Sequence, residues 1–440
     1  MLRSSFFVVV IVISIAITLA SVEEESWKPV YIQPEQLHIS LGEQPTEIVA
    51  TWTTMEKTNH SICHYGEESK ATFDYSANGQ QSLFIDGGVR KRHMYIHRVY
   101  MKQLKPNTRY IYHCGSEAGW SDMFFFKTFP SGNDWQPRFV IYGDLGNDNA
   151  QTMAMLQEEI QTGHHDLVTH VGDFAYDMHT DNALVGDEFM RQIQPIAAYV
   201  PYQVMAGNHE RAYNYSNYNH RFTMHSQGQK EINNHFWSYN IGPVHLIAIN
   251  TDFWEHLHFG AHMIHNQFKW LEEDLKQANE PENRKKQPWI ITMGHHPLYY
   301  QARVPDNKIR IGTDKLPGLE PLLYKYGVDL SFWAHDHIYT RFLPVYNEKI
   351  FNGTRQDPYY NPKSPVHIIT GSAGCREFVT PVRPNPHPYT AYVSNDYGYT
   401  YMTVMNNTHI QLKQVSRNQN GKVIDEITLV KEQHGPEAWY

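Results

Sequence analysis

The 440-residue sequence predicts an antiparallel β-sandwich followed by an α/β domain. Its length exceeds the roughly 250–300 residues at which a single core stops growing, which favours two domains. Between residues 28 and 130, apolar and polar residues alternate in short runs separated by turn residues, as in Arg109–His113. From residue 137 to residue 435, apolar strands alternate with amphipathic helices. These two patterns are typical of a sandwich and of an α/β sheet.

The predicted sandwich contains no stretch with helical spacing. Glu47–Trp52 and Met123–Phe126 show the same two-residue period, and Pro130–Asp134 then breaks the pattern, so we place the domain boundary there. Cys63 and Cys114 fall in strand-like stretches, where they form a disulfide or remain buried thiols. A total of 3 cysteines excludes a disulfide-rich scaffold and a thiolate zinc cluster.

The α/β domain is predicted from six apolar runs and four helical ones. The strands are Phe139–Tyr142, Leu167–Val171, Gln203–Ala206, Val244–Ile249, Trp289–Met293 and Leu330–Trp333. The helices are Ala150–Ile160, Asp187–Ala198, Gln267–Ala278 and Leu319–Tyr326. Three last alternating runs, expected to extend a sheet as antiparallel strands, are Tyr399–Val404, His409–Val415 and Val423–Val430.

Charge and hydropathy exclude two classes of protein. The formal net charge of −9 disfavours a protein that binds nucleic acid by neutralising phosphates. A single long apolar run excludes a protein with several membrane spans.

That apolar run, Phe6–Ala20, follows Arg3 and precedes three glutamates. It is shorter than the ~20 residues of a spanning helix, so we interpret residues 1–20 as a secretory signal peptide cleaved near Ala20. The alternative is a short uncleaved anchor, which Ser14 and Thr18 disfavour by interrupting the apolar core. No stable membrane insertion is therefore expected.

Four Asn-x-Ser/Thr sequons agree with secretion. We expect N-glycans at Asn59, Asn214, Asn352 and Asn406. A chain of this kind is delivered outside the cell or to a lysosome, and the sequence does not choose between these destinations or fix the oligomeric state.

Five of the predicted strands run directly into a small residue and a side chain that can bind metal. The five motifs are Gly143-Asp144-Leu145-Gly146, Gly172-Asp173-Phe174-Ala175-Tyr176, Gly207-Asn208-His209-Glu210, Gly294-His295-His296 and Ala334-His335-Asp336-His337. In an open α/β sheet, sites form beyond the carboxyl ends of the strands, so these motifs converge at one edge.

The residue types in these motifs suit a pair of hard or borderline cations, which prefer carboxylate, amide oxygen and imidazole ligands. Two ions about 3.5–4 Å apart can clamp the attacking and departing oxygens of an in-line displacement. Taken singly, each motif has a simpler interpretation, such as a turn with a helix cap or a surface histidine pair. Five turns in the same relation to five strands favour the metal site.

The ordered motifs resemble those of the binuclear metallophosphoesterases, and within them the purple acid phosphatases. Most of that superfamily has Asp-x-His in the first motif, whereas this chain has Asp144-Leu145-Gly146, and its second motif ends in Tyr176. Both departures mark the purple branch. Ala334 replaces a frequent Gly and Thr292 a frequent Val, and neither change removes a ligand. The resemblance implies a fibronectin-type-III-like sandwich followed by a metallophosphoesterase-type αββα sandwich.

The resemblance also implies the ligands. The ferric ion is expected to be bound by Asp144, Asp173, Tyr176 and His337. The divalent ion, which is zinc, iron or manganese, is expected to be bound by Asp173, Asn208, His295 and His335. The split agrees with metal chemistry, because phenolate and carboxylates suit a trivalent ion and imidazoles suit a divalent one.

The function implied is an acid phosphatase that hydrolyses small phosphate monoesters by attack of metal-bound hydroxide at an Fe(III)–M(II) centre. His209 is the expected proton donor to the leaving group. His296 either contacts the phosphate or packs away from it in a hydrogen bond. A phosphodiesterase or nucleotide hydrolase with the same metals is the alternative, and a non-catalytic adhesion glycoprotein is disfavoured because all expected ligands are present.

Overall fold

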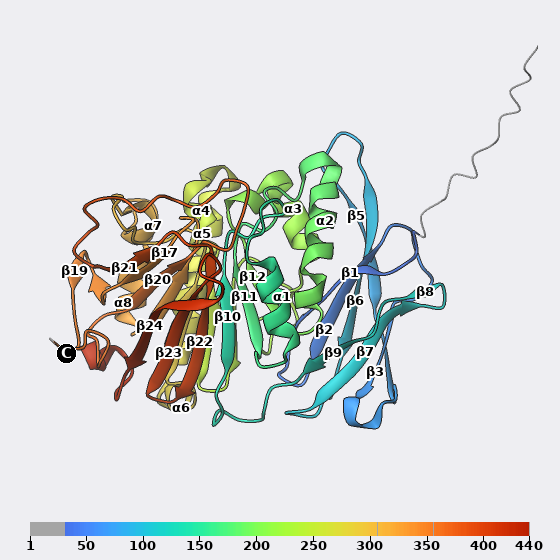
Figure 1. Ribbon diagram of the computed structural model, residues 1–440, viewed down its shortest axis with the longest axis horizontal. Coiled ribbons are helices and arrows are strands. Elements are labelled where there is room, and N and C mark those ends of the chain that lie inside the picture. The colour runs from blue at the N-terminus through green and yellow to red at the C-terminus, as the bar shows by residue number, and fades with distance from the viewer. Residues whose placement is uncertain (1–30, 306, 355, 440) are drawn as a thin grey trace, which may run out of the picture. The chain divides into compact units, whose positions relative to one another are not determined.

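The computed structural model describes residues 31–305, 307–354 and 356–439, so the predicted signal peptide at residues 1–20 lies outside the described residues. The N-terminal region forms two antiparallel sheets, coloured blue to cyan in Figure 1. One sheet has the order β1 (Glu35–Leu41), β2 (Ile48–Thr54), β6 (His93–Met101) and β5 (Gln80–Ile85). The other has the order β4 (Tyr75–Asn78), β3 (Ile62–Glu67), β7 (Arg109–Ser116) and β8 (Gly119–Trp120), with β9 (Phe124–Lys127) paired to β7.

Alternating apolar side chains from the two sheets share one core. Trp52 of one sheet and Tyr110, Tyr112 and Phe126 of the other are almost fully buried. The only helical element among the described residues of this region is the short 3-10 turn Glu68–Lys70. The predicted antiparallel β-domain is confirmed.

A disulfide joins Cys63 on β3 to Cys114 on β7, and these residues are direct partners in the strand pairing. Of the two alternatives, disulfide or buried thiols, the structure therefore has the disulfide. Cys375 is a buried free thiol.

The catalytic region contains two larger sheets. The first has the order β12 (Tyr202–Met205), β11 (Leu167–Val171), β10 (Arg138–Tyr142), β22 (Gly398–Asn406), β23 (His409–Ser416) and β24 (Lys422–Val430). Its first three strands are parallel, and β22 to β24 extend the sheet antiparallel, as predicted.

The second sheet has seven strands and combines predicted and unpredicted elements. Its order is β13 (Trp237–Ile241), β14 (Val244–Ala248), β15 (Trp289–Met293), β16 (Leu330–Trp333), β20 (Val366–Thr370), β17 (Tyr339–Phe342) and β21 (Thr390–Ser394). Strands β14, β15 and β16 were predicted, whereas β13, β17, β20 and β21 were not. A separate two-stranded ribbon pairs β18 (Val345–Tyr346) with β19 (Lys349–Ile350).

The two catalytic sheets meet at their middle strands, with helices outside (Figure 1). Thr400 on β22 donates a hydrogen bond to Thr370 on β20 at 2.9 Å. The helices are α1 (Met153–Gln161), α2 (Thr180–Ala197), α3 (Ala212–Arg221), α4 (Asp252–Glu255), α5 (Ala261–Ala278), α6 (Pro281–Lys286), α7 (Asn307–Arg310) and α8 (Leu319–Lys325). This arrangement confirms the predicted αββα sandwich. Within the described residues, no helix combines the length and apolar character needed to cross a membrane.

Two predicted helices begin too late in the sequence. The second helix was expected to begin at Asp187, but α2 begins at Thr180. Its residues Asp181–Ala183 have left-handed dihedral angles and precede the regular turns. The third was expected from Gln267, but α5 begins at Ala261, six residues earlier, with the exposed residues His262 and His265 in its first turns. Polar residues interrupt the apolar spacing at both beginnings, Thr180–Asn182 in α2 and His262 and His265 in α5, so the pattern could not mark them.

The sandwich packs directly against the catalytic region, and both lie within one compact unit, residues 32–440. The Gln194 side chain of α2 accepts a hydrogen bond from the Leu37 backbone at 2.8 Å. The Tyr112 hydroxyl donates to the Ala198 carbonyl at 2.6 Å.

Removing the disulfide should destabilise the fold. The bridge closes a sequence separation of 51 residues, so replacing Cys63 and Cys114 by alanine should lower the free energy of unfolding by about 2–4 kcal/mol. Urea denaturation of both proteins measures this difference. Under reducing conditions the difference should shrink, because the wild-type chain then also lacks the bridge; equal stabilities in oxidising buffer would contradict the prediction.

Candidate metal centre

The five motifs lie in loops at the carboxyl ends of β10, β11 and β12 of the first sheet and of β15 and β16 of the second. They therefore converge where two sheets meet, and the expectation of one edge of a single sheet was wrong. Glycine is required in two of them because the loops approach one another closely. A Cβ on Gly207 would lie 2.2 Å from Asp173 Oδ1, and one on Gly172 would lie 2.6 Å from His295 Nδ1. Only glycine allows the backbone of one motif to pass so near the side chain of another.

Asp173, His295 and His335 gather at one point, and each offers a ligand atom within 4.8 Å of the others. His295 Nδ1 lies 2.8 Å from the Val171 carbonyl, so it carries the hydrogen, and Nε2 lies 3.0 Å from Asp173 Oδ2. That contact needs positive charge, which would come either from a proton on Nε2 or from a metal ion that both atoms bind. The buried amide oxygen of Asn208 has no hydrogen-bond partner in the structure. These donors fit a divalent ion.

The ligands expected for the ferric ion form a second group. The Tyr176 hydroxyl donates to Asp144 Oδ1 at 2.9 Å and lies 3.0 Å from His337 Nε2. The His337 Nδ1 atom lies 2.8 Å from the Phe378 carbonyl, which turns Nε2 toward the acidic groups. Asp144 Oδ2 accepts the backbone N–H of His335 at 3.0 Å, which links the two groups. Phenol, carboxylate and imidazole together fit a trivalent ion.

Buried charge dominates the titration of these side chains. Burial lowers the pKa of His295, but the carboxylates of Asp173 and Asp144 outweigh it and raise the pKa to about 10. Burial raises the pKa of the Tyr176 phenol well above its usual value, and Asp144 and Asp173 raise it further. Binding of a metal must therefore displace protons from these groups, so the affinity for metal falls as the solution becomes more acidic.

Glu210 holds the second and third motifs together. It is buried, and it accepts backbone N–H bonds from Asp173 at 2.8 Å, Phe174 at 2.9 Å and Gly207 at 2.9 Å. Burial and the nearby Asp173 carboxylate raise the pKa of Glu210 to about 8. Glu210 was quoted within its motif without a role, because two of its donors, Asp173 and Phe174, belong to another motif loop that only the fold brings near.

His209 lies between several acidic groups at the edge of the centre. Its backbone N–H donates to Asp173 Oδ1 at 2.9 Å, and its Nδ1 lies 2.5 Å from Asp177 Oδ1. Its Nε2 lies 3.6 Å from Glu377 Oε1, and its ring packs against Tyr176 with centroids 4.3 Å apart. Burial lowers the pKa of His209, but Asp177 and Asp173 outweigh it and raise the pKa to about 9. Neither Asp177 nor Glu377 was predicted from the sequence as a neighbour of His209.

His296 forms hydrogen bonds with Thr251 and Asp252. Its backbone N–H donates to the Thr251 hydroxyl at 2.7 Å, and its Nε2 lies 3.3 Å from Asp252 Oδ1. Its ring packs against His335 with centroids 4.0 Å apart. Asp252 is itself bonded to the Tyr215 hydroxyl at 2.5 Å. The structure therefore contains a hydrogen bond of the kind that was one of the two arrangements expected for His296.

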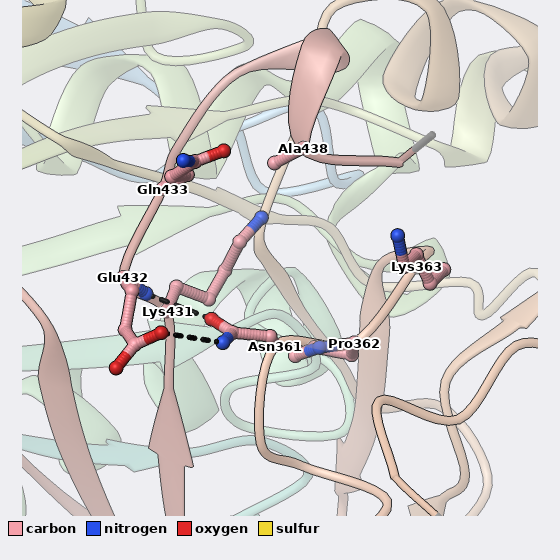
Figure 2. A pocket seen from close by; sticks show the side chains of 7 residues that line it. All are labelled: Asn361, Pro362, Lys363, Lys431, Glu432, Gln433 and Ala438. Atoms are coloured by element: carbon pink, nitrogen blue, oxygen red, sulfur yellow. Dashed lines mark hydrogen bonds between the residues drawn. The ribbon is translucent and has the colours of Figure 1, made fainter.

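A cavity of about 260 Å³ lies far along the chain from these motifs, near the C-terminal segment. Figure 2 shows its lining, in which Glu432 and Asn361 bond each other at 2.8 and 3.0 Å. Lys431 pairs with buried Asp329 at 2.6 Å. None of the expected metal ligands lines this cavity.

Comparison with known proteins agrees with this architecture. Family models match residues 34–128 (purple acid phosphatase, N-terminal domain), residues 137–339 (calcineurin-like phosphoesterase) and residues 364–426 (iron/zinc purple acid phosphatase-like protein C). A solved purple acid phosphatase from yellow lupin seeds matches with a TM-score of 0.71 over 90% of this chain and 74% of that one. At 21% identity, that likeness supports the fold alone. The fold and the motif loops define a calcineurin-like metallophosphoesterase.

Two curated relatives show which family within the metallophosphoesterases the chain belongs to. Acid phosphatase type 7 of Danio rerio is 49% identical over 93% of this chain and 94% of its own length. The human acid phosphatase type 7 is 46% identical over 90% of this chain and 91% of its own length. The chain belongs to the purple acid phosphatase family.

Removing the Glu210 carboxylate should loosen the centre. Glu210→Ala leaves three buried N–H groups without an acceptor, so we expect the metal-free protein to lose about 2–4 kcal/mol of unfolding free energy and to bind metal more weakly. Denaturation and metal titration measure the two effects. Glu426→Ala, at an exposed position, is the control and should change stability by less than about 0.5 kcal/mol. Equal behaviour of the two variants would show that Glu210 does not hold the motifs.

Proposed function

We propose that this chain is an acid phosphatase that hydrolyses phosphate monoesters at a binuclear metal centre. The observation that carries the proposal is the convergence of five motif loops on one buried group of carboxylates, imidazoles, an amide and a phenol. Membership of the purple acid phosphatase family supports it.

The proposed centre combines a ferric ion with zinc, iron or manganese. The ferric ligands are Asp144, Asp173, Tyr176 and His337, and the divalent ligands are Asp173, Asn208, His295 and His335. When bound, such a pair of ions acidifies water and withdraws charge from a phosphate ester. The anionic side chains of the first group and the imidazoles of the second support this division.

The chain's own residues supply the proton that the leaving group needs. His209 is 18% exposed at its side chain, and its Nδ1 faces Asp177, so Nε2 is the atom that can reach a leaving oxygen. Asp177 orients this imidazole, and Arg376 lies 3.5 Å from the second Asp177 oxygen. Glu377 Oε1 lies 3.6 Å from Nε2, and we propose that a leaving oxygen replaces this contact when substrate binds.

His296 is the second residue that we place beside the phosphate. Asp252 holds its Nε2, so any contact with substrate falls to Nδ1 or to the ring. In this role His296 positions the bound ester and supports His335, against which it packs.

We also propose that the chain is a glycoprotein delivered outside the cell or to a lysosome. The signal-like segment at residues 1–20 supports entry into the secretory route. Asn59, Asn214, Asn352 and Asn406 are all exposed, as glycan attachment requires.

The preferred ester class can be measured directly. At about pH 5, where an ordinary histidine is protonated, metal-replete protein should hydrolyse 4-nitrophenyl phosphate much faster than bis(4-nitrophenyl) phosphate. Initial rates under identical conditions give the ratio of kcat/KM for the two esters. Faster cleavage of the diester would assign the chain to the alternative class, and loss of both activities would reject a hydrolytic role.

Replacing His209 should affect poor leaving groups most. His209→Ala removes the proton donor, so kcat for an alkyl phosphate should fall by about 10²–10⁴-fold, whereas an ester with an acidic phenol should lose much less. A series of leaving groups measures the slope. His164→Ala is the control, because His164 is exposed and precedes β11 at the opposite edge of the sheet. Equal loss across the series would reject the donor role.

A further inference from the structure

The N-terminal domain reaches the edge of the catalytic region where the motif loops lie. Its residues 86–92, which we call the Asp86–Arg92 loop, join β5 to β6 beside the beginning of α2 (Figure 1). Helix α2 follows the second motif, and α3 follows the third. The loop contacts the first turns of both helices, at Asn182 and Tyr213, and also contacts Asp187 and Asn217 further along them.

These first turns contain two strained segments. Asp181, Asn182 and Ala183 have φ of 49°, 55° and 67°, and Tyr213–Tyr215 have φ of 53°, 58° and 59°. None of the six is glycine, and each residue in this left-handed region costs about 1–2 kcal/mol. Such conformations persist only when surrounding contacts hold them.

The Asp86–Arg92 loop holds the first strained segment. The backbone N–H of Arg90 donates to the Asn182 side chain at 3.0 Å. The Arg92 guanidinium forms an ion pair with buried Asp187 of α2. Both bonds cross from the N-terminal domain to the catalytic region.

The same loop holds the second strained segment. The Tyr213 ring lies directly on Gly87, where a Cβ would be 2.2 Å from the ring carbon Cγ. Asp86 Oδ1 accepts a bond from the Asn217 side chain of α3 at 3.1 Å. The loop therefore contacts α2 and α3 with adjacent residues.

Buried Arg221 joins the two helices behind the loop. It donates to Asp187 at 2.8 Å, to the Ala183 carbonyl at 3.3 Å and to Gln36 of β1 at 2.9 Å. Asp187 thus lies between two guanidinium groups, Arg92 and Arg221, and its charge is satisfied when either one remains. This redundancy allows the Arg92 contact to be removed without leaving a buried charge unpaired.

Each strained segment begins four residues after a group at the metal centre: Asp177 precedes Asp181, and His209 precedes Tyr213. His209 Nδ1 lies 2.5 Å from Asp177 Oδ1. The His179 and Tyr213 rings pack with centroids 5.6 Å apart. We propose that the Asp86–Arg92 loop positions His209 and Asp177 by holding both strained segments, so that the N-terminal domain contributes to catalysis. Its residues are positioning residues, since none contacts the reacting atoms.

The alternative is that the loop only docks one domain on the other. Arg191 provides the matched control, because it lies on the same helix one turn beyond Asp187 and pairs with Glu35 of the N-terminal domain at 2.8 Å. The Arg191 pair crosses the same domain boundary but contacts neither strained segment. A docking role predicts equal effects of removing either arginine.

The kinetic test compares Arg92→Ala with Arg191→Ala, and it depends on the proposed phosphatase function. For an alkyl phosphate, Arg92→Ala should lower kcat about 10-fold or more with a smaller change in KM, because a misplaced proton donor acts in the transition state. Arg191→Ala should stay within about twofold of wild type, and Arg92→Lys should restore part of the rate. Equal kcat values for the two alanine variants would overturn the proposal.

Hydrogen exchange tests the same proposal without substrate. Amides of residues 178–186 and 211–219 should exchange faster in Arg92→Ala than in wild type, while Arg191→Ala leaves them unchanged. Gly87→Ala is a second variant; Gly87 does not have a left-handed φ, so the new methyl acts only by displacing Tyr213. Unchanged exchange in both Arg92→Ala and Gly87→Ala would reject the positioning role. An inactive wild-type protein would reject the phosphatase function and leave this exchange result to stand alone.

Discussion

The structure depends on the concentration of acidic and imidazole groups where the carboxyl ends of strands from both catalytic sheets meet, and positive charge is needed there to hold them together. Asp173 and His295 approach to 3.0 Å, and Tyr176, Asp144 and His337 lie within hydrogen-bond distance of one another in a buried space. Bringing such groups out of water is costly unless a cation or proton compensates. Parallel strands provide the backbone that presents them, since β10, β11 and β12 in one sheet and β15 and β16 in the other all end at the centre.

Around this centre, a set of contacts fixes the orientation of each functional side chain. Glu210 ties two motifs through their backbones, and Asp252 and Asp177 orient His296 and His209. In each case at least one bond joins segments that are distant in the sequence, with separations of 37, 44 and 32 residues. The precision needed at the reacting atoms thus comes from groups that do not touch substrate.

Sequence reasoning was successful where a feature is local. Strands such as Phe139–Tyr142 are continuous apolar runs because both faces are buried, and each motif follows its strand directly. Strand β21 was missed because its residues are only partly buried and its pairing with β17 shifts register, so no clear period remains. Asp177 and Glu377 were missed because only the fold brings them to His209. The disulfide stayed open until the register placed Cys63 opposite Cys114.

Elemental analysis of the purified, oxidised and fully folded protein tests the central claim most directly. Two tightly bound metal ions per chain, at least one of them iron, are expected, and both should be lost when the buried carboxylates and imidazoles become protonated in acid. A well-folded chain that carries no iron and still hydrolyses phosphate monoesters at the normal rate would contradict the account.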